Sequence, residues 1–495
     1  MVKGLCLTSS GLMLLLAGCG TGGGATDDST VGATPALEAA AGSAPAVLPS
    51  ELEPAIDSAG IAATVTTSGT LDRTSTFFQP LGTNPRTCET CHGSGQGWSL
   101  TALGATILFV QSDGLAPLFL PHDEGARPDG NLSTEISRLV DFGPTTLARA
   151  LTRFTRTNPA TSEYNVIAVN DPSGFSTTTS FLNFRRPSAT ANEALVSSVT
   201  WTAGPGTVRN ALSGLVTGAS TLHEQRDPTN PVPAAVVQAQ DDFQLGVFFA
   251  QSIDNVAGRL DTDGATGGPI NLMAQPFHIG INDIQGLDPS GQPFSPNVFN
   301  LFDAWAIYNQ DGNHDHDHAH ACPPGTRDDD SHRHRVAAAR AAIYRGQQLF
   351  NLRQFNISGV NGLNNLLGQT TVAGTCSTCH NAPNVGGHSV VRMFDVGTAD
   401  QINCGQQLPL VTVQNKTTNE TRTVCDLGRA NGSHLWAEIG TFRAPPLRGL
   451  AARTPYFHDG QAPRIDDVIS YFDRRFQIGL SGAEKSDLLA FLSAL

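Results

Sequence analysis

The most constraining feature of this chain is a five-residue pattern that occurs twice. Cys-x-x-Cys-His stands at residues 88–92 and again at residues 376–380. At this spacing two thiols reach the two vinyl groups of a haem, while the adjacent imidazole reaches the iron. The pattern therefore predicts two covalently bound haem c groups. The residues that would hold them are Cys88, Cys91 and His92 in the first motif and Cys376, Cys379 and His380 in the second.

A Cys-x-x-Cys pair has two other common uses. It occurs in redox-active dithiols and as half of a zinc site. Either use would require histidine to follow the second cysteine twice by chance, in a chain with nine cysteines and 14 histidines among 495 residues. Haem attachment explains both histidines at once. Apolar helix-like segments precede the motifs, at residues 77–82 and 341–350.

The beginning of the chain indicates export. A basic start with Lys3 is followed by an apolar run that ends in Leu-Ala-Gly-Cys at residues 16–19, as in secretory signals. The run is too short to span a bilayer. Its end resembles a bacterial lipobox, which implies cleavage before Cys19 and acylation of that cysteine. We therefore expect a lipoprotein in the periplasm or on the outer surface, anchored to a membrane by lipid. An ordinary cleaved signal is the alternative.

The remaining cysteines fit an exported protein. Cys6 belongs to the signal. Cys404 and Cys425 lie in one loop-rich segment, where an oxidising compartment favours a disulfide. Cys322 is left over, and both a free thiol and a metal ligand are compatible with the sequence.

Composition argues against one class of partner. The formal net charge is −14, from 30 Lys and Arg against 44 Asp and Glu. A chain this acidic repels a polyanion, so we expect no nucleic-acid partner. With 39% apolar and 15% charged residues, the composition is that of a folded protein with a buried core.

The pattern along the chain predicts five segments. Residues 1–19 are the lipoprotein-type signal, and residues 20–70, rich in Gly, Ala, Ser, Thr and Pro, are a flexible tether. Residues 71–312 and 336–495 each contain one motif and are expected to form a haem c domain. Residues 313–335 form a His/Asp-rich linker between them.

The linker contains a dense group of potential metal ligands. Residues 314–320 are His-Asp-His-Asp-His-Ala-His, and His332 and His334 are close by. Imidazoles and carboxylates at this density bind zinc, copper or nickel. A solvated linker explains the same composition.

Several segments near the end of the chain resemble a known family. Phe-Arg-Ala-Pro-Pro-Leu-Arg-Gly-Leu at residues 442–450 is followed by Pro-Tyr-Phe-His-Asp-Gly at residues 455–460, and helical patterns follow around residues 465–472 and 483–494. In this order after the second motif, they resemble the bacterial di-haem cytochrome c peroxidase and MauG superfamily. The resemblance covers about residues 75–495. It implies a mainly α fold, with two cytochrome c-like haem domains, long loop insertions, and haems that approach at the domain interface.

The resemblance also implies chemistry and partners. We expect haem-dependent electron transfer and peroxide reduction, with a small electron-donor redox protein and peroxide as partners. A calcium ion between the domains, bound largely through backbone oxygens, is implied as well. One alternative is a non-catalytic electron-transfer cytochrome with two six-coordinate irons. Another is a MauG-like haem oxidase or oxygenase, for which the insertions at residues 110–180 and 260–300 could shape a substrate pocket.

Catalytic roles transfer only in part from the family. Trp201 matches the tryptophan of the family's Trp-Asp-Gly-Arg motif, which relays electrons between the haems, although Asp and Arg are missing here. Leu-His-Glu-Gln at residues 222–225 resembles the family's Leu-x-x-Gln segment, which makes Glu224 and Gln225 candidates. The peroxidatic Glu expected after Gln225 has no counterpart in residues 228–240. Peroxide cleavage needs an acid–base group, and three side chains could substitute: His122, His223 and Glu224.

The far ligand of the second haem is a further departure. The family supplies Met or Tyr from the helix after the Pro-Tyr-Phe-His segment, and the aligned residue here is Phe472, which cannot bind iron. Tyr471 is adjacent, but it would lie about 100° further round a helix. His388 and His458 are the other candidates as metal ligands. For each of these histidines, a hydrogen bond to the backbone is an equally good explanation.

Overall fold

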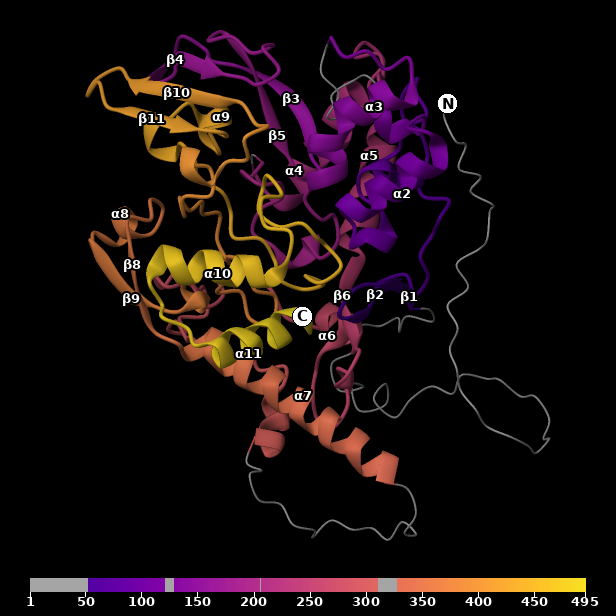
Figure 1. Ribbon diagram of the computed structural model, residues 1–495, viewed down its shortest axis with the longest axis vertical. Helices are drawn as coiled ribbons and strands as arrows, with labels where there is room; N and C mark the ends of the chain where they lie inside the picture. The colour runs from indigo at the N-terminus through magenta and orange to yellow at the C-terminus, as the bar shows by residue number, and fades with distance from the viewer. Residues whose placement is uncertain (1–51, 121–128, 205, 310–326) are drawn as a thin grey trace, which may run out of the picture. The chain divides into compact units, whose positions relative to one another are not determined.

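A computed structural model describes residues 52–120, 129–204, 206–309 and 327–495. The described residues belong to one compact unit. The expected domain boundaries at residues 312 and 336 stay predictions. The helices in Figure 1 are α2 (Ala102–Ser112), α3 (Glu135–Phe142), α4 (Val208–Leu222), α5 (Ala234–Leu245), α6 (Gly268–Met273), α7 (Arg327–Leu352), α8 (Asn364–Leu367), α9 (Ala430–Ser433), α10 (Ile465–Phe476) and α11 (Gly482–Ser493).

Strands form four sheets, so the expected mainly α fold is wrong. The sheets have the orders β1-β2-β6-β7, β11-β10-β4, β3-β5 and β8-β9. Each pairing is antiparallel. The strands are β1 (Glu53–Ile56), β2 (Gly60–Thr66), β3 (Thr152–Thr157), β4 (Tyr164–Asn170), β5 (Ser180–Arg185), β6 (Val247–Asp254), β7 (Gly258–Arg259), β8 (Phe355–Ser358), β9 (Thr371–Gly374), β10 (Leu410–Asn415) and β11 (Thr421–Val424).

The insertions account for part of this difference. β4 lies in the insertion at residues 110–180 and pairs with β10 from the second half of the chain, with Val169 opposite Val411. Residues of β10 alternate between half-buried and buried, as expected for a strand with one covered face. Val411, Val413 and Tyr164 pack in one apolar cluster. The family resemblance did not predict this sheet. It pairs a strand of an insertion with the half of the chain that contains the second motif.

The tether predicted for residues 20–70 ends earlier than expected. β1 and β2 lie within that range, and β2 pairs with both β1 and β6. Ala62 and Val65 of β2 are buried in two different apolar clusters, because side chains alternate along a strand and both faces of this one are covered. Residues 20–51 and the signal with Cys19 lie outside the described residues.

The helical predictions differ in outcome. The two C-terminal patterns are confirmed as α10 and α11, and the pattern at residues 341–350 lies in α7. A helix at residues 77–82 is wrong, because only Thr76–Phe78 form a short 3-10 turn. Pro80 follows directly, and proline lacks the N–H that a helix interior requires.

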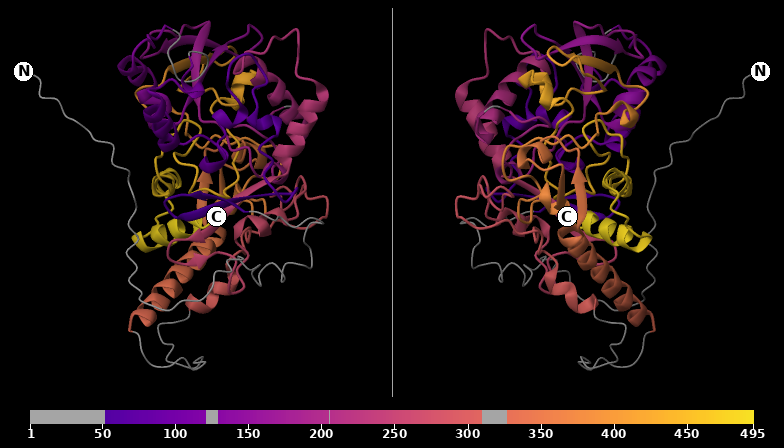
Figure 2. Two further views of the ribbon diagram at one scale, coloured as in Figure 1. Left: turned by 90° about the vertical axis from the view of Figure 1, so that its right-hand side faces the viewer. Right: turned by 90° about the vertical axis from the view of Figure 1, so that its left-hand side faces the viewer.

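The second motif's half of the chain is built on the packing of α7 against α11, which Figures 1 and 2 show side by side. A Cβ at Gly346 of α7 would collide with the carbonyl oxygen of Asp487 in α11, so glycine permits this close approach. Arg345 donates two hydrogen bonds to the Asp487 carboxylate, at 2.8 and 2.7 Å. Phe350 and Phe491 meet in the core beneath. Within the described residues, no helix is long and apolar enough to cross a bilayer.

Candidate functional site

Both Cys-x-x-Cys-His motifs adopt the same backbone turn. The residue before the first cysteine is threonine in both, Thr87 and Thr375, and its N–H donates to Oγ1 of Thr90 or Thr378 at 3.0 Å in each case. The first three residues of each motif form a 3-10 turn. The N–H of the motif histidine then donates to the carbonyl of the first cysteine, at 3.0 and 3.2 Å. The threonines hold the cysteines and histidine of each motif in one repeated geometry.

The two cysteines of each motif pack against different parts of the core. Cys88 packs against one apolar cluster and Cys91 against another. Cys376 packs against the α7–α11 core, and Cys379 against the cluster of β8 and β9. None of these four cysteines forms a disulfide with another described residue. Each motif therefore presents its thiols in two directions from one turn, as attachment at two vinyl groups requires.

The protonation state of these thiols bears on the two alternatives to haem attachment, a redox-active dithiol and a zinc site. Burial raises the pKa of Cys88, Cys376 and Cys379 to about 12. Reactive dithiols and zinc sites depend on the thiolate, which is favoured by a lowered pKa. The surroundings of these cysteines thus disfavour a thioredoxin-like dithiol.

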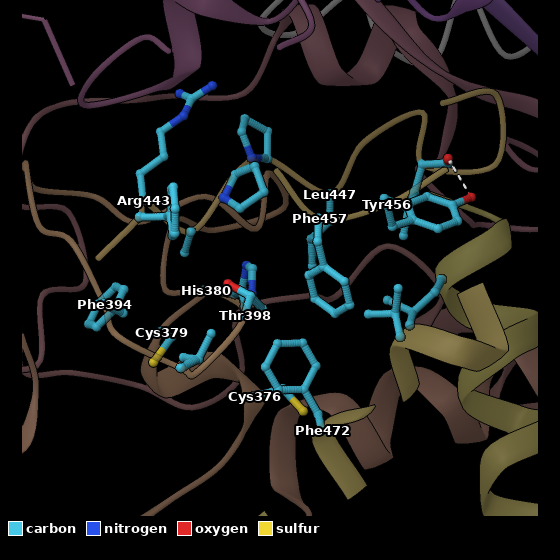
Figure 3. A pocket seen from close by; sticks show the side chains of 18 of the residues that line it. Cys376, Cys379, His380, Phe394, Thr398, Arg443, Leu447, Tyr456, Phe457 and Phe472 are labelled. Atoms are coloured by element: carbon cyan, nitrogen blue, oxygen red, sulfur yellow. Dashed lines mark hydrogen bonds between the residues drawn. The ribbon is translucent and has the colours of Figure 1, made fainter. Parts of the chain in front are cut away.

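The second motif opens onto a cavity of about 260 Å³, shown in Figure 3. Cys376, Cys379 and His380 line it together with side chains from α7, α10 and α11. Most of the other lining side chains are apolar, as for a porphyrin ring; they include Phe350, Phe394, Leu447, Phe457, Phe472 and Leu488.

The imidazole of His380 is held by the backbone. Its Nδ1 lies 2.5 Å from the carbonyl oxygen of Gly386, so Nδ1 carries the proton and Nε2 keeps its lone pair. Desolvation by burial lowers the pKa of His380, which favours the neutral form that binds metals. Haem-ligating histidines are oriented by such a second hydrogen bond. The residues at this motif therefore fit an axial iron ligand.

Phe472 lines the cavity, and Figure 3 shows its ring beside that of Phe457. Tyr471 points elsewhere, because its hydroxyl donates to the carbonyl oxygen of Val396 at 2.8 Å. The structure thus places the residue aligned with the family's far ligand in the cavity, and that residue has no ligating atom.

His388 lies behind the motif rather than among the side chains that line the described cavity. Its Nδ1 is 2.9 Å from the carbonyl oxygen of Cys379. Its Nε2 faces Asp283, with 3.9 Å between Nε2 and Oδ1. Burial lowers the pKa of His388 to about 3, so the imidazole is neutral. Nε2 has no hydrogen-bond partner among the described residues, but His388 does not line the cavity, so its role as a metal ligand stays a prediction.

His458 lines the cavity. Its ring stacks on Phe442 with 4.0 Å between ring centroids. Its Nε2 lies 3.9 Å from Oδ2 of Asp426, and neither ring nitrogen has a hydrogen-bond partner among the described residues. Burial lowers the pKa of His458. Of the two predicted histidines, His458 is the one with ring nitrogens available at the cavity.

Buried arginines provide the positive charge of the cavity. Arg186, Arg443 and Arg453 line it, and burial lowers the pKa of each to about 10. Within the described chain, Nε of Arg186 and Nε of Arg443 have no hydrogen-bond partner. Buried cations of this kind require anionic partners. The two propionates of a haem are anions of suitable charge.

The first motif is enclosed by aromatic side chains and one amide. Phe77, Trp98 and Phe243 form a contacting group, and Cys88 packs against it. Nε2 of Gln240, on α5, donates to Sγ of Cys88 at 2.9 Å. Burial lowers the pKa of His92 to about 4, so this imidazole is also neutral and able to bind iron.

Glu224 and Gln225 differ in position. Glu224 is 3% exposed and accepts a hydrogen bond from the N–H of Leu81. Burial raises the pKa of Glu224, and its charge contributes to the raised pKa of Cys88. Gln225 is exposed. The structure therefore brings Glu224 to the first motif and leaves Gln225 at the surface.

His223 is also near the first motif. Its charge acts on His92, lowering the pKa of that imidazole as a minor cause after burial. Its carbonyl oxygen accepts hydrogen bonds from the side chains of Asn84 and Arg86, at 2.8 and 3.1 Å. His122 lies outside the described residues.

Trp201 lies at the cavity of the second motif. Its ring centroid is 6.5 Å from that of His458. Its indole N–H donates to the carbonyl of Arg186 at 2.8 Å. The backbone of Ser188, two residues further along, acts on the pKa of His92 in the first motif. This position suits the relay role that the resemblance implies.

Of the predictions about cysteines and metal ligands, one has an outcome. The disulfide between Cys404 and Cys425 is confirmed. Among the described residues, the one group of three potential metal-ligating side chains joins Cys425 to His458 and Asp459, and the disulfide occupies that cysteine. The His/Asp-rich tract at residues 314–320 and Cys322 lie outside the described residues.

Three residues near the motifs were missed by sequence reasoning. Gln240 contacts Cys88, and Arg443 and Glu193 line the cavity. Arg443 lies in the segment that carried the family resemblance, so the sequence could have indicated a role for its positive charge. Gln240 and Glu193 have no motif around them, and only the folded chain brings them to the sites.

Comparison with known proteins confirms the resemblance for part of the chain. No family model matches. The cytochrome-c peroxidase IdrP2 of Denitromonas iodatirespirans is 29% identical over 136 residues, which cover 25% of this chain and 37% of that protein. The cytochrome c peroxidase Ccp of Escherichia coli (strain K12) is 29% identical over 122 residues, 24% of this chain and 22% of that protein. The matched region thus spans about a third or less of these relatives.

A solved structure is also similar in part. It is the crystal structure of a MauG-like protein associated with microbial copper homeostasis, with 16% sequence identity and a TM-score of 0.30. The similarity covers 63% of this chain and 75% of that chain.

Proposed function

We propose that this chain is an exported di-haem c-type cytochrome that takes electrons from a small redox protein and reduces hydrogen peroxide. The observation that carries the proposal is the repeated turn, in which a threonine cap orients two thiols and a neutral imidazole at both motifs. The similarity to cytochrome c peroxidases supports the same function.

Cys88, Cys91 and His92 would hold one haem, and Cys376, Cys379 and His380 the other. Bound haem supplies the one-electron chemistry of iron and a coordination position for an oxidant. The arginines of the second cavity would bind the propionates by charge-assisted hydrogen bonds. A calcium ion between the haem-binding regions is part of the proposal on the strength of the resemblance alone.

The protein's own residues would handle electrons and protons. Reduction of peroxide to two waters consumes two electrons and two protons. Trp201 would pass electrons between the sites. Glu224, whose pKa is raised by burial, would supply or accept protons near the first motif. We also propose a periplasmic or outer-surface location with a lipid anchor on Cys19.

One experiment tests covalent haem attachment. The protein would be expressed with a haem c maturation system, denatured, extracted and weighed by mass spectrometry. We expect the mass of two haems on the wild-type chain and of one on the double variants C88S/C91S and C376S/C379S. The matched control C404S/C425S removes two cysteines outside the motifs and should keep both haems. A wild-type chain without haem mass would overturn the proposal.

A second experiment tests turnover. The two-haem protein is given hydrogen peroxide and a reduced small cytochrome, and oxidation of the donor is followed by absorbance. Donor oxidation that depends on both peroxide and both motifs supports the peroxidase. If no reduced donor is oxidised, the result contradicts peroxide reduction. Electron transfer would then remain as the proposed function.

A specific observation favours a carrier as the second candidate. Gln225 is exposed, and the carboxylate of Glu224 is engaged by the N–H of Leu81. Electron paramagnetic resonance separates the two functions, because an open iron gives a high-spin ferric signal and a carrier with two six-coordinate irons gives two low-spin signals.

A further inference from the structure

A carboxyl group without a role in the proposed function lines the cavity of the second motif. Glu193 begins a short 3-10 turn, Glu193–Leu195, and is 6% exposed. Its side chain is among those that line the cavity. Within the described residues, Oε2 has no hydrogen-bond partner. A buried carboxylate oxygen without a donor favours the protonated acid.

Two side chains of opposite charge act on Glu193. Arg443, which Figure 3 shows at the cavity, attracts its negative charge, and Asp241 of α5 repels it. Arg443 is fixed by its own donation to the carbonyl oxygen of Ser198 and keeps Nε without a partner. A cation that lines the cavity and a carboxylate on α5 thus have opposite effects on the charge of Glu193, and α5 packs against the turn that contains it.

Asp241 connects this position to the surface. It is 1% exposed, yet it lines a separate groove of about 500 Å³ between α4 and α5. Its Oδ2 accepts a hydrogen bond from Ser213 of α4 at 2.5 Å, and its Oδ1 has no partner in the described part of the chain. The groove also contains the exposed pair Arg209 and Asp242. A titratable group thus stands at the inner wall of a surface groove, beside Glu193.

We propose that Glu193 binds one proton when the haem at Cys376, Cys379 and His380 is reduced and releases it on oxidation, with Asp241 and the α4–α5 groove as the route to solvent. The inference rests on the proposed function, because it requires haem at the second motif. It adds a role that the peroxidase and carrier functions would share.

The physical cause is electrostatic. A haem held by Cys376, Cys379 and His380 would take one electron from a one-electron donor, and the cavity would then hold one positive charge less. The carboxylate of Glu193 then loses part of its stabilisation and takes up one proton from water. Burial, together with Asp241, already raises the pKa of Glu193 to about 8 despite Arg443, so the change falls in an accessible pH range. The negative charge of ionised Asp241 acts on Glu193. Protonated Glu193 carries no charge, so it does not act on Asp241 in the same way.

The test is the pH dependence of the second haem's midpoint potential, measured by spectroelectrochemistry with small-molecule mediators. Coupled uptake of one proton changes the reduction equilibrium up to tenfold per pH unit, or about 59 mV for one electron. We expect the potential to fall as pH rises in a window around pH 8. The isosteric variant E193Q cannot titrate, and its potential should be flat across that window. A slope that survives in E193Q would overturn the proposal.

Two variants on α5 provide matched comparisons. D241N removes the negative charge that raises the pKa of Glu193, so the window should move to lower pH. D242N changes the next residue on the same helix, whose side chain is 55% exposed, and should leave the window in place. Equal shifts in both variants would contradict the assignment to Asp241.

A measurement on the wild type avoids dependence on folding of the variants. Infrared difference spectra between oxidised and reduced protein should show a protonated carboxyl band that appears on reduction and shifts in deuterium oxide. Absence of such a band overturns the inference. If no second haem is present, no second potential exists and the proposed function itself fails. Two haems with a pH-independent second potential refute the inference alone.

Discussion

Nδ1 of His380 lies 2.5 Å from the carbonyl oxygen of Gly386, six residues along the same loop. Gly386 has a φ of +76°, and a Cβ there would approach the side chains of Phe299 and Leu447, at 2.8 and 3.0 Å. The carbonyl that orients the imidazole is thus held by a backbone conformation that favours glycine. This links the packing of the α7–α11 core to the orientation of an iron ligand.

The variant G386A should therefore affect both stability and the second haem. We expect a loss of about 1–3 kcal/mol in the free energy of unfolding, because the left-handed backbone is strained and the core must shift. The absorbance and paramagnetic resonance signals of the second haem should also change. G368A is the matched control: Gly368 has a φ of +64° and open space around a Cβ. It should lose stability through strain alone, with both haem signals unchanged. Equal spectra for the two variants would argue against a role of Gly386 in orienting His380.

A buried ion pair close to the cavity makes stability depend on pH. Asp426 accepts hydrogen bonds from Nε and Nη2 of Arg185, at 2.6 and 2.8 Å. Burial alone would raise the pKa of Asp426, but Arg185 and other donors lower it to about 2. The folded pKa thus lies below the unfolded value, so this stabilisation is complete above about pH 4 and is lost as the pH falls towards 2.

The variant D426N should lower the free energy of unfolding by about 3–5 kcal/mol at pH 7, because it leaves the Arg185 guanidinium buried without a counter-charge. The difference in the free energy of unfolding between D426N and the wild type should be smaller by about 1 kcal/mol at pH 3. Urea unfolding at both pH values measures it. A gap that stays constant or widens at pH 3 would show that Asp426 is not ionised through this range.

The haem motifs and the C-terminal helices were predictable because their information is local. The five residues of each motif carry their own spacing, and α10 and α11 carry their own apolar periodicity. The antiparallel sheets were not predictable in the same way. The partner of β4 is β10, and nothing near Val169 indicates that Val411 will lie opposite.

The surroundings of the motifs depend on the same long-range contacts. Gln240 reaches Cys88 across 152 positions of sequence. The pKa of Glu193 is raised only because burial and Asp241 act on it in the folded chain. The sequence could identify Glu224 through its neighbours but could not tell that Gln225, one residue later, would be exposed.

Trp201 gives a prediction about electron transfer. Its ring lies near His458, and its indole N–H is fixed on Arg186. W201F should slow electron transfer between the haems by about tenfold, equivalent to about 1.4 kcal/mol of barrier, while both midpoint potentials stay the same. Flash photolysis of the half-reduced protein measures the rate. W436F is the control, because Trp436 packs on the same apolar cluster but does not line the cavity. A rate in W201F equal to that of W436F would exclude the relay.

Phe472 gives a prediction about iron ligation. Because its side chain lines the cavity without a ligating atom, the variant F472M should place a thioether there. We expect the second haem to become low-spin and its potential to rise, since methionine ligation favours the reduced iron. Paramagnetic resonance and redox titration measure both. The control Y471M changes the neighbouring residue of α10, which does not line the cavity, and should leave the spin state unchanged.

The variant H458A separates the two candidates for the far side of this iron. If His458 is the ligand, its removal converts a low-spin signal to high-spin, and F472M alone has little effect. If the position is open, the wild-type signal is already high-spin, H458A leaves it so, and F472M converts it. An unchanged signal in F472M together with an unchanged signal in H458A would mean that neither side chain faces the iron.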